Sequence, residues 1–110
     1  MEPSCLLTLS DEWTELAPGP DVQRIAAAAH LADGWLAKQV QEGRCTLPLR
    51  PLEDKCVLHG QCHQKALVGV GGTAAALRLV PGLDVTVLDA GCCGMAGSFG
   101  YEKEHYELSV

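Results

Sequence analysis

The chain has 110 residues, enough for one small domain with a modest core. Its net charge of −6 and pI near 5.0 argue against a sequence-independent nucleic-acid binder, which needs a basic surface to displace counterions from phosphate. No apolar stretch approaches the roughly 20 residues that span a bilayer, and the N-terminus lacks the pattern of a signal peptide, so we expect a cytoplasmic protein without a transmembrane segment.

The N-terminal half predicts two helices. The first covers residues 6–16, with Ser4 as a candidate cap that places Cys5 in the first turn, and the Pro-Gly-Pro that follows ends it. The second begins at Asp21, a candidate N-cap, and continues as far as Gly43. Its predicted apolar face consists of Ile25, Ala29, Ala32, Leu36 and Val40.

The C-terminal half predicts a strand–helix–strand unit after a proline-containing loop over residues 44–55. Residues 56–60 and 84–88 are short apolar runs of the kind found in buried parallel strands. The helix between them lies within residues 65–80 and starts or restarts after the glycine pair inside it, and a final helix begins at Tyr101. Such a crossover is nearly always right-handed with its strands parallel. We therefore expect an α/β fold: a small parallel sheet with flanking helices.

Cysteines follow both predicted strands. Cys62 lies just past the first strand and Cys92-Cys93 just past the second, so both loops should emerge at the same carboxyl edge of the sheet. Open α/β sheets place ligands at that edge. If Cys5 also follows a strand, one that precedes the present sequence, its thiol joins the same edge. We therefore expect these four thiols to lie close together.

Six cysteines are many for a cytoplasmic chain, where disulfides seldom persist and clustered thiols more often bind metal or carry out redox chemistry. We interpret Cys45 and Cys56 as small apolar residues. Cys92 and Cys93, flanked by glycines, are poor core residues, and a disulfide between neighbours would be strained and easily reduced. A metal site is the preferred interpretation, because thiolates select zinc or iron–sulfur clusters and the N–H groups of a glycine-rich loop can hydrogen-bond to cluster sulfurs.

Two histidines flank Cys62 in the segment LHGQCHQKA. His59 and His63 are candidates for hydrogen-bond support of a metal ligand, and an imidazole in this place could also bind zinc itself. His30 and His105 show no comparable pattern, and we interpret them as structural or surface residues.

Three segments in this order carry a resemblance to a known family: EPSCLLTLSDEW, LHGQCHQKA and CCGMAGSFGYEKEHYE. They resemble the cysteine-rich CCG domain of FAD-linked 2-hydroxy-acid oxidases that carry an iron–sulfur segment. The same signature is found in the iron–sulfur subunit of glycolate oxidase and, more distantly, in heterodisulfide reductase. The resemblance covers nearly the whole chain, and the CCG element with its upstream Cys-His is the specific part.

The resemblance implies a single electron-transfer domain, residues 1–110, truncated at both ends, whose cysteines hold a 4Fe-4S-type cluster. Cys62, Cys92 and Cys93, followed by Gly94, match the core signature, and Cys5 matches the cysteine that precedes it. The cluster would take electrons from an FAD that has oxidised D-lactate, glycolate, D-2-hydroxyglutarate or a similar 2-hydroxy acid. That FAD would belong to a flavin domain of the same polypeptide or complex and would not bind to this chain.

The chain departs from the family pattern in two ways. No GTSC-like cysteine follows the CCG element, and the sequence contains neither a flavin-binding domain nor a ferredoxin-like Cys-X-X-Cys-X-X-Cys run. We therefore expect a fragment that oxidises no substrate alone, holds its cluster only partly or not at all, and can carry adventitious zinc on the same thiols. Any contact with a membrane would come through the parent complex, and the electron acceptor is not identified.

Two other functions stay open at this stage. In the first, Cys5, Cys62, Cys92 and Cys93 form a closed tetrahedral zinc site that only braces the domain and has no redox role. In the second, Cys92 and Cys93 carry out thiol–disulfide exchange, which would require a perturbed thiol pKa and a reversible redox couple without metal.

Overall fold

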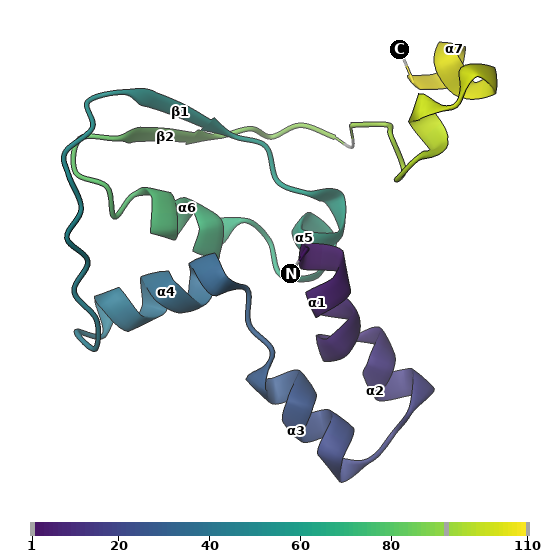
Figure 1. Ribbon diagram of the computed structural model, residues 1–110, viewed down its shortest axis with the longest axis horizontal. Helices are drawn as coiled ribbons and strands as arrows, with labels where there is room; N and C mark the ends of the chain where they lie inside the picture. The colour runs from purple at the N-terminus through teal and green to yellow at the C-terminus, as the bar shows by residue number, and fades with distance from the viewer. Residues whose placement is uncertain (1, 92, 110) are drawn as a thin grey trace.

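The computed structural model describes residues 2–91 and 93–109 and has an α/β architecture with a small sheet (Figure 1). The helices are α1 (Pro3–Ser10), α2 (Glu12–Leu16), α3 (Pro20–Ala28), α4 (Ala32–Gln41), α5 (Cys62–Leu67), α6 (Gly71–Leu77) and α7 (Tyr106–Ser109). The strands are β1 (Lys55–Leu58) and β2 (Asp84–Val87), and two 3-10 turns, η1 (Phe99–Tyr101) and η2 (Lys103–His105), precede α7. None of the helices in the described ranges is long and apolar enough to cross a membrane.

The sheet consists of β1 and β2, which pair in parallel as the sequence predicted. Cys56 lies opposite Val85, and Val57 lies opposite Thr86. Val85 is buried, and α6 contacts β2, with α4 beyond α6 in Figure 1. Val57 points to the other face of the sheet and is 61% exposed. The prediction of buried strands is therefore wrong for one face, because helices of the described chain cover only the other.

The predicted helix over residues 6–16 is α1 followed by α2. Asp11 interrupts it with φ −122° and ψ −84°. α1 also begins earlier than predicted, and its N-cap is Glu2 rather than Ser4, because the Glu2 carboxylate accepts a hydrogen bond from the Ser4 N–H at 3.3 Å. The Ser4 hydroxyl and N–H hold the pKa of Glu2 below its ordinary value, so this cap is ionised at neutral pH and is lost as the carboxylate is protonated in acid. Cys5 lies in the first turn, as predicted.

The predicted helix over residues 21–43 is also two helices, α3 and α4. The chain becomes extended at Ala29 and Leu31, with ψ of 116° and 134°. Gly19 is the N-cap of α3, so Asp21 lies in its first turn and does not cap it. This break lets α3 pack against α1 and α2 while α4 packs against α6, which one straight helix could not do.

α4 and α6 approach each other at a pair of glycines. A Cβ atom added to Gly72 would lie only 2.9 Å from the Cα of Gly34. Beside this contact, the buried Gln64 donates from Nε2 to Thr73 Oγ1 at 2.8 Å, and Thr73 Oγ1 donates to Asp33 Oδ2 at 2.5 Å. These hydrogen bonds join α4, α5 and α6 and satisfy the polar groups that the packing covers.

We expect Gly72→Ala to destabilise the fold, because the added methyl group forces two helix backbones apart. Overpacking of this kind costs about 1–3 kcal/mol, against at most about 1 kcal/mol gained from the helix propensity of alanine. Gly71→Ala in the same helix is the matched control, since nothing lies within 4 Å of its Cβ position. Urea unfolding followed by circular dichroism measures both variants. A Gly72→Ala chain as stable as Gly71→Ala would contradict the close helix contact.

The packed core is thin. The buried apolar side chains of the described ranges are Leu7, Ala37, Ala74 and Val85. The molecule measures 46 × 43 × 19 Å, and its radius of gyration of 17.1 Å exceeds the roughly 13 Å expected for a compact chain of this length. The segment with η1, η2 and α7 lies to one side of the sheet in Figure 1. The predicted final helix from Tyr101 is thus divided between 3-10 turns and the short helix α7.

Candidate functional site

The loop that follows β1 contacts the loop that follows β2. His59 Nε2 lies 3.2 Å from the carbonyl oxygen of Gly91, to which it donates, and Lys65 Nζ donates to the carbonyl oxygen of Ala90. The paired residues are 32 and 25 positions apart in the sequence. Two side chains from the first loop and α5 therefore hold the backbone that leads directly into Cys92.

The hydrogen bond from Lys65 to the Ala90 carbonyl oxygen was not predicted from the sequence. Lys65 lies three residues after Cys62, so it is about one helical turn away from the cysteine on the same side of α5. This three-residue spacing from Cys62 is the sequence feature that could have identified Lys65 as part of the candidate site. A long side chain on a short helix can reach a neighbouring loop, and here Lys65 donates to the backbone of the predicted cysteine loop.

Cys5 and Cys62 both lie at the beginning of helices that pack against each other, α1 and α5. Both residues are exposed free cysteines. The thiol of Cys5 donates to a carboxylate oxygen of Glu2 at 3.5 Å. At α5, the side chain of Gln61 accepts the N–H of Gln64 at 2.8 Å, so a side-chain cap fixes the helix start at Cys62. Two of the predicted ligands therefore stand at the ends of contacting helices, open to the surroundings.

The loop around Cys93 is built from left-handed backbone. Gly94 and Gly97 have φ of 81° and 71°, and Ala96 has φ of 47°, which is uncommon for a residue with a side chain. Cys93 is exposed. Cys92, the other half of the pair, lies outside the described residues. Glycine at position 94 lets the backbone turn directly after the cysteine pair, which a larger residue could do only with strain.

His63 bridges two helices. Its Nε2 lies 3.3 Å from Glu12 Oε1 on α2, while Glu12 Oε2 is buried without a hydrogen-bond partner among the described atoms. The contact joins α5 to α2. A role for His63 beside a metal stays a prediction, as does the corresponding role of His59.

The predicted ligands do not form a complete metal site within the described residues. No three histidine, cysteine, aspartate or glutamate side chains of residues 2–91 and 93–109 gather closely enough to hold a metal ion. The donor chemistry nevertheless fits a thiolate-bound group, because the described cysteines are all free. The exposed ones are the predicted ligands Cys5, Cys62 and Cys93, whereas the two with no assigned ligand role, Cys45 and Cys56, are partly buried.

We expect Lys65→Met to loosen the contact between the two loops. Loss of a charge-assisted hydrogen bond at a partly exposed site should lower the free energy of unfolding by about 0.5–1.5 kcal/mol. Lys103→Met removes the same charge from η2, away from the Ala90 carbonyl, and should change stability by less than about 0.5 kcal/mol. Urea unfolding compares the two variants, and equal losses would show that Lys65 acts only through net charge.

Comparison with known proteins shows similarity to parts of two dehydrogenases. The chain is 41% identical over 106 residues to one subunit of the anaerobic glycerol-3-phosphate dehydrogenase of Escherichia coli K12 and of O157:H7, which covers 96% of this chain and 26% of each relative. It is 30% identical over 112 residues to the D-2-hydroxyglutarate dehydrogenase of Escherichia coli K12, covering 100% of this chain and 10% of that relative. The chain thus spans about a quarter of the first relatives and a tenth of the other. No family model and no solved structure matches it.

Proposed function

We propose that the chain is a cluster-binding, electron-relaying region of a flavin-dependent dehydrogenase. Two findings support the proposal: the relatives are dehydrogenases by name, and the EPSC, QCH and CCG segments resemble the iron–sulfur part of FAD-linked oxidases. One relative is a subunit, and the other is a polypeptide about ten times longer than the matched segment. The flavin domain that supplies electrons is therefore a partner either in another subunit or in the same polypeptide.

The observation that carries the proposal is the division of the thiols by exposure. Cys5, Cys62 and Cys93 are exposed, and Cys45 and Cys56 are partly buried. A free cysteine usually packs as a small apolar residue, so exposed cysteines call for a chemical reason. Hydrogen bonds from His59 and Lys65 join the loops after β1 and β2. This contact supports the proposal that the exposed thiols bind one shared metal cluster.

Within this proposal, Cys5, Cys62, Cys92 and Cys93 supply the thiolates. The turn at Gly94 lets backbone N–H groups approach the sulfurs, and His59 and His63 support the ligands through hydrogen bonds. A 4Fe-4S cluster, when bound, would supply a one-electron carrier between the flavin and an acceptor. No residue of this chain acts as a general acid or base, because the substrate reacts at the flavin.

The relatives' names also bear on the substrate class. Glycerol 3-phosphate and D-2-hydroxyglutarate both carry a secondary hydroxyl group and an anionic group. We extend the predicted substrate class accordingly, from 2-hydroxy acids to small organic anions with a secondary alcohol, oxidised at FAD in the partner domain. The proposed location is the cytoplasm, where thiols stay reduced, with any membrane contact made through a partner subunit.

A structural zinc site on the same four thiols is the second candidate. The thin core favours it, because the buried apolar side chains in the described ranges are few and small domains often gain stability from a bound metal. Zinc would then brace α1, α5 and the loop after β2 without any redox role.

Anaerobic reconstitution separates the two candidates. The chain is incubated with ferrous iron, sulfide and an equal amount of zinc, and bound metal and acid-labile sulfide are measured after desalting. The electron-transfer proposal predicts bound iron and sulfide with broad visible absorption that bleaches on reduction with dithionite. Because the chain by itself is expected to hold its cluster only partly, the same metal and sulfide assay on the anaerobically purified full-length protein decides: zinc alone, without iron or acid-labile sulfide, in that protein would overturn the proposal in favour of the structural site.

A further inference from the structure

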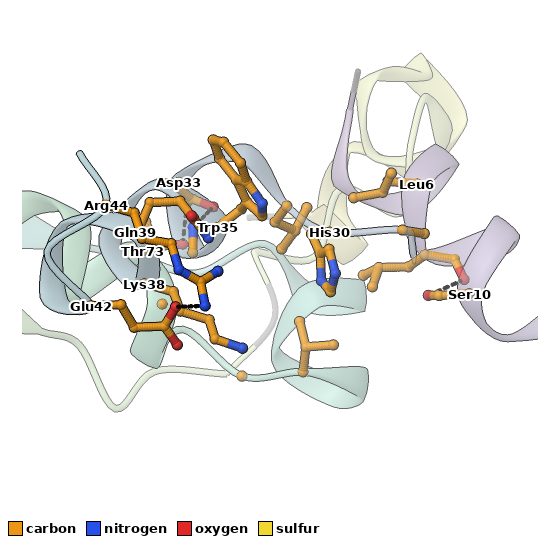
Figure 2. Close-up of a pocket in the computed structure, with 17 residues that line it drawn as sticks. Leu6, Ser10, His30, Asp33, Trp35, Lys38, Gln39, Glu42, Arg44 and Thr73 are labelled. Atoms are coloured by element: carbon orange, nitrogen blue, oxygen red, sulfur yellow. Dashed lines mark hydrogen bonds and ion pairs between the residues drawn. The ribbon is translucent and has the colours of Figure 1, made fainter. Parts of the chain in front are cut away.

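A cavity of about 530 Å³ lies between α1, α4 and the turn that joins α5 to α6 (Figure 2). This volume is typical of pockets that hold small molecules. Leu6, Leu7 and Val68 provide apolar lining, and none of the described cysteines lines the cavity. Sequence patterns do not predict this cavity, because its lining comes from separate segments that contain no motif.

Basic side chains gather on the wall formed by α4 and the residues around it. Lys38, Arg44 and His30 all line this cavity and are labelled in Figure 2. All three residues are exposed. Lys38 and Arg44 balance the two acidic residues of the lining, Asp33 and Glu42, so the cavity lacks the acidic excess of the whole chain, whose net charge is −6.

The acidic groups of the cavity already have partners. Asp33 accepts hydrogen bonds from the Thr73 hydroxyl at 2.5 Å and from the Gly34 N–H at 2.8 Å. Glu42 pairs with Arg44 through an Nη2–Oε2 distance of 3.2 Å. Lys38 and His30, by contrast, have no ion-pair or side-chain hydrogen-bond partner within the described ranges, and the guanidinium of Arg44 has further N–H groups to donate.

An indole ring forms another part of the same lining. Trp35 lines the cavity and is 51% exposed, which is a large apolar surface to leave in water. Its flat face, together with the leucine side chains of α1, suits an aromatic or other apolar group. The cavity therefore combines an apolar surface with two basic side chains, Lys38 and His30, that have no acidic partner in the described ranges, and with an Arg44 that is paired on one side only.

We propose that this cavity binds a small organic anion. Its phosphate or carboxylate group accepts hydrogen bonds from Lys38, His30 and the free N–H groups of Arg44, and its apolar or aromatic part lies against Trp35 and the leucines. Ammonium and guanidinium groups are the usual partners of such anions, with Arg able to bind two oxygens at once. This site does not depend on metal binding at the cysteines.

Phenyl phosphate is a suitable probe, because it carries an aromatic ring and an anionic group and is small enough for this cavity. Titration into Trp13→Phe protein, in which Trp35 is the only tryptophan, should give a saturable change in fluorescence. Phenol, which lacks the anion, should bind at least about tenfold more weakly, as expected for the loss of charge-assisted hydrogen bonds. Calorimetry with the unaltered chain should give the same dissociation constant, and sodium benzoate in place of phenyl phosphate tests whether a carboxylate suffices.

Lys38→Met tests the recognition itself. It should weaken phenyl phosphate binding about tenfold while leaving the circular dichroism spectrum unchanged, since Lys38 is exposed. Lys103→Met removes the same charge from η2 and should leave binding unchanged. Equal affinity of Lys38→Met and the unaltered chain, an equal loss in both variants, or no saturable binding of phenyl phosphate or benzoate would overturn the proposal.

Discussion

Cys62→Ser should abolish cluster binding while leaving the metal-free fold almost unchanged. Cys62 is an exposed residue at the start of α5, so replacing its sulfur by oxygen disturbs little packing. A serine hydroxyl is a poor substitute for a thiolate, because iron–sulfur clusters and zinc select soft sulfur ligands. Loss of a direct ligand should exceed the roughly 10–100-fold loss of metal affinity caused by removing an outer hydrogen-bond partner. Bound iron and acid-labile sulfide after anaerobic reconstitution measure the effect.

Cys45→Ser is the matched control for this experiment. Cys45 is partly buried in the loop between α4 and β1, and the account gives it no ligand role. Its substitution should leave iron and sulfide per chain unchanged, with at most a modest loss of stability. If Cys45→Ser lost as much iron as Cys62→Ser, cluster loss would report general unfolding, and the assignment of ligands would be wrong.

The second large effect is expected in the flavin-dependent dehydrogenase to which we propose that this chain belongs. Cys92→Ser should stop electron transfer to an external acceptor while substrate still reduces the flavin at its normal rate. The two steps separate because the proposed chain relays electrons and takes no part in the chemistry at the flavin. Stopped-flow absorbance follows flavin reduction, and reduction of an artificial dye follows the relay. We expect a loss of more than about 100-fold in dye reduction only, because loss of a direct ligand should exceed the roughly 10–100-fold loss caused by removing an outer hydrogen-bond partner.

The comparison of the two rates is what makes this prediction specific. A structural zinc site would predict that Cys92→Ser weakens the protein and lowers both rates together, in proportion to the folded fraction. Equal loss of flavin reduction and of dye reduction would therefore count against the electron-transfer function and in favour of the structural zinc site.

The parallel pairing of β1 and β2 could be predicted from the sequence, because two short apolar runs separated by a helix leave few topologies. The breaks in the N-terminal helices could not. Ala29 has high helix propensity and continues the apolar face, yet it is extended in the structure, because α3 and α4 pack against different partners. The exposed face of the sheet was also missed, since Val57 looks like a core residue when only its own strand is considered.

The candidate site was predictable only in part. Glycine and cysteine spacing identified the loop after β2, and the structure adds the hydrogen bonds of His59 and Lys65 to its backbone. Lys65 carries no motif, and its role depends on a contact between loops that sequence spacing does not show. The cavity beside Trp35 could not be predicted from the sequence, because Lys38 and His30 line one cavity only when the chain breaks between α3 and α4.

Cysteine alkylation of the iron-loaded chain tests whether four sulfur atoms from distant parts of the sequence bind one metal group. The chain is treated anaerobically with iodoacetamide before and after iron removal, and each cysteine is followed by mass spectrometry. The account predicts that Cys5, Cys62, Cys92 and Cys93 become protected together when iron is bound, while Cys45 reacts at one rate in both states. If Cys5 or Cys62 reacted as fast in the iron-bound chain as in the iron-free chain, the shared metal site would be contradicted.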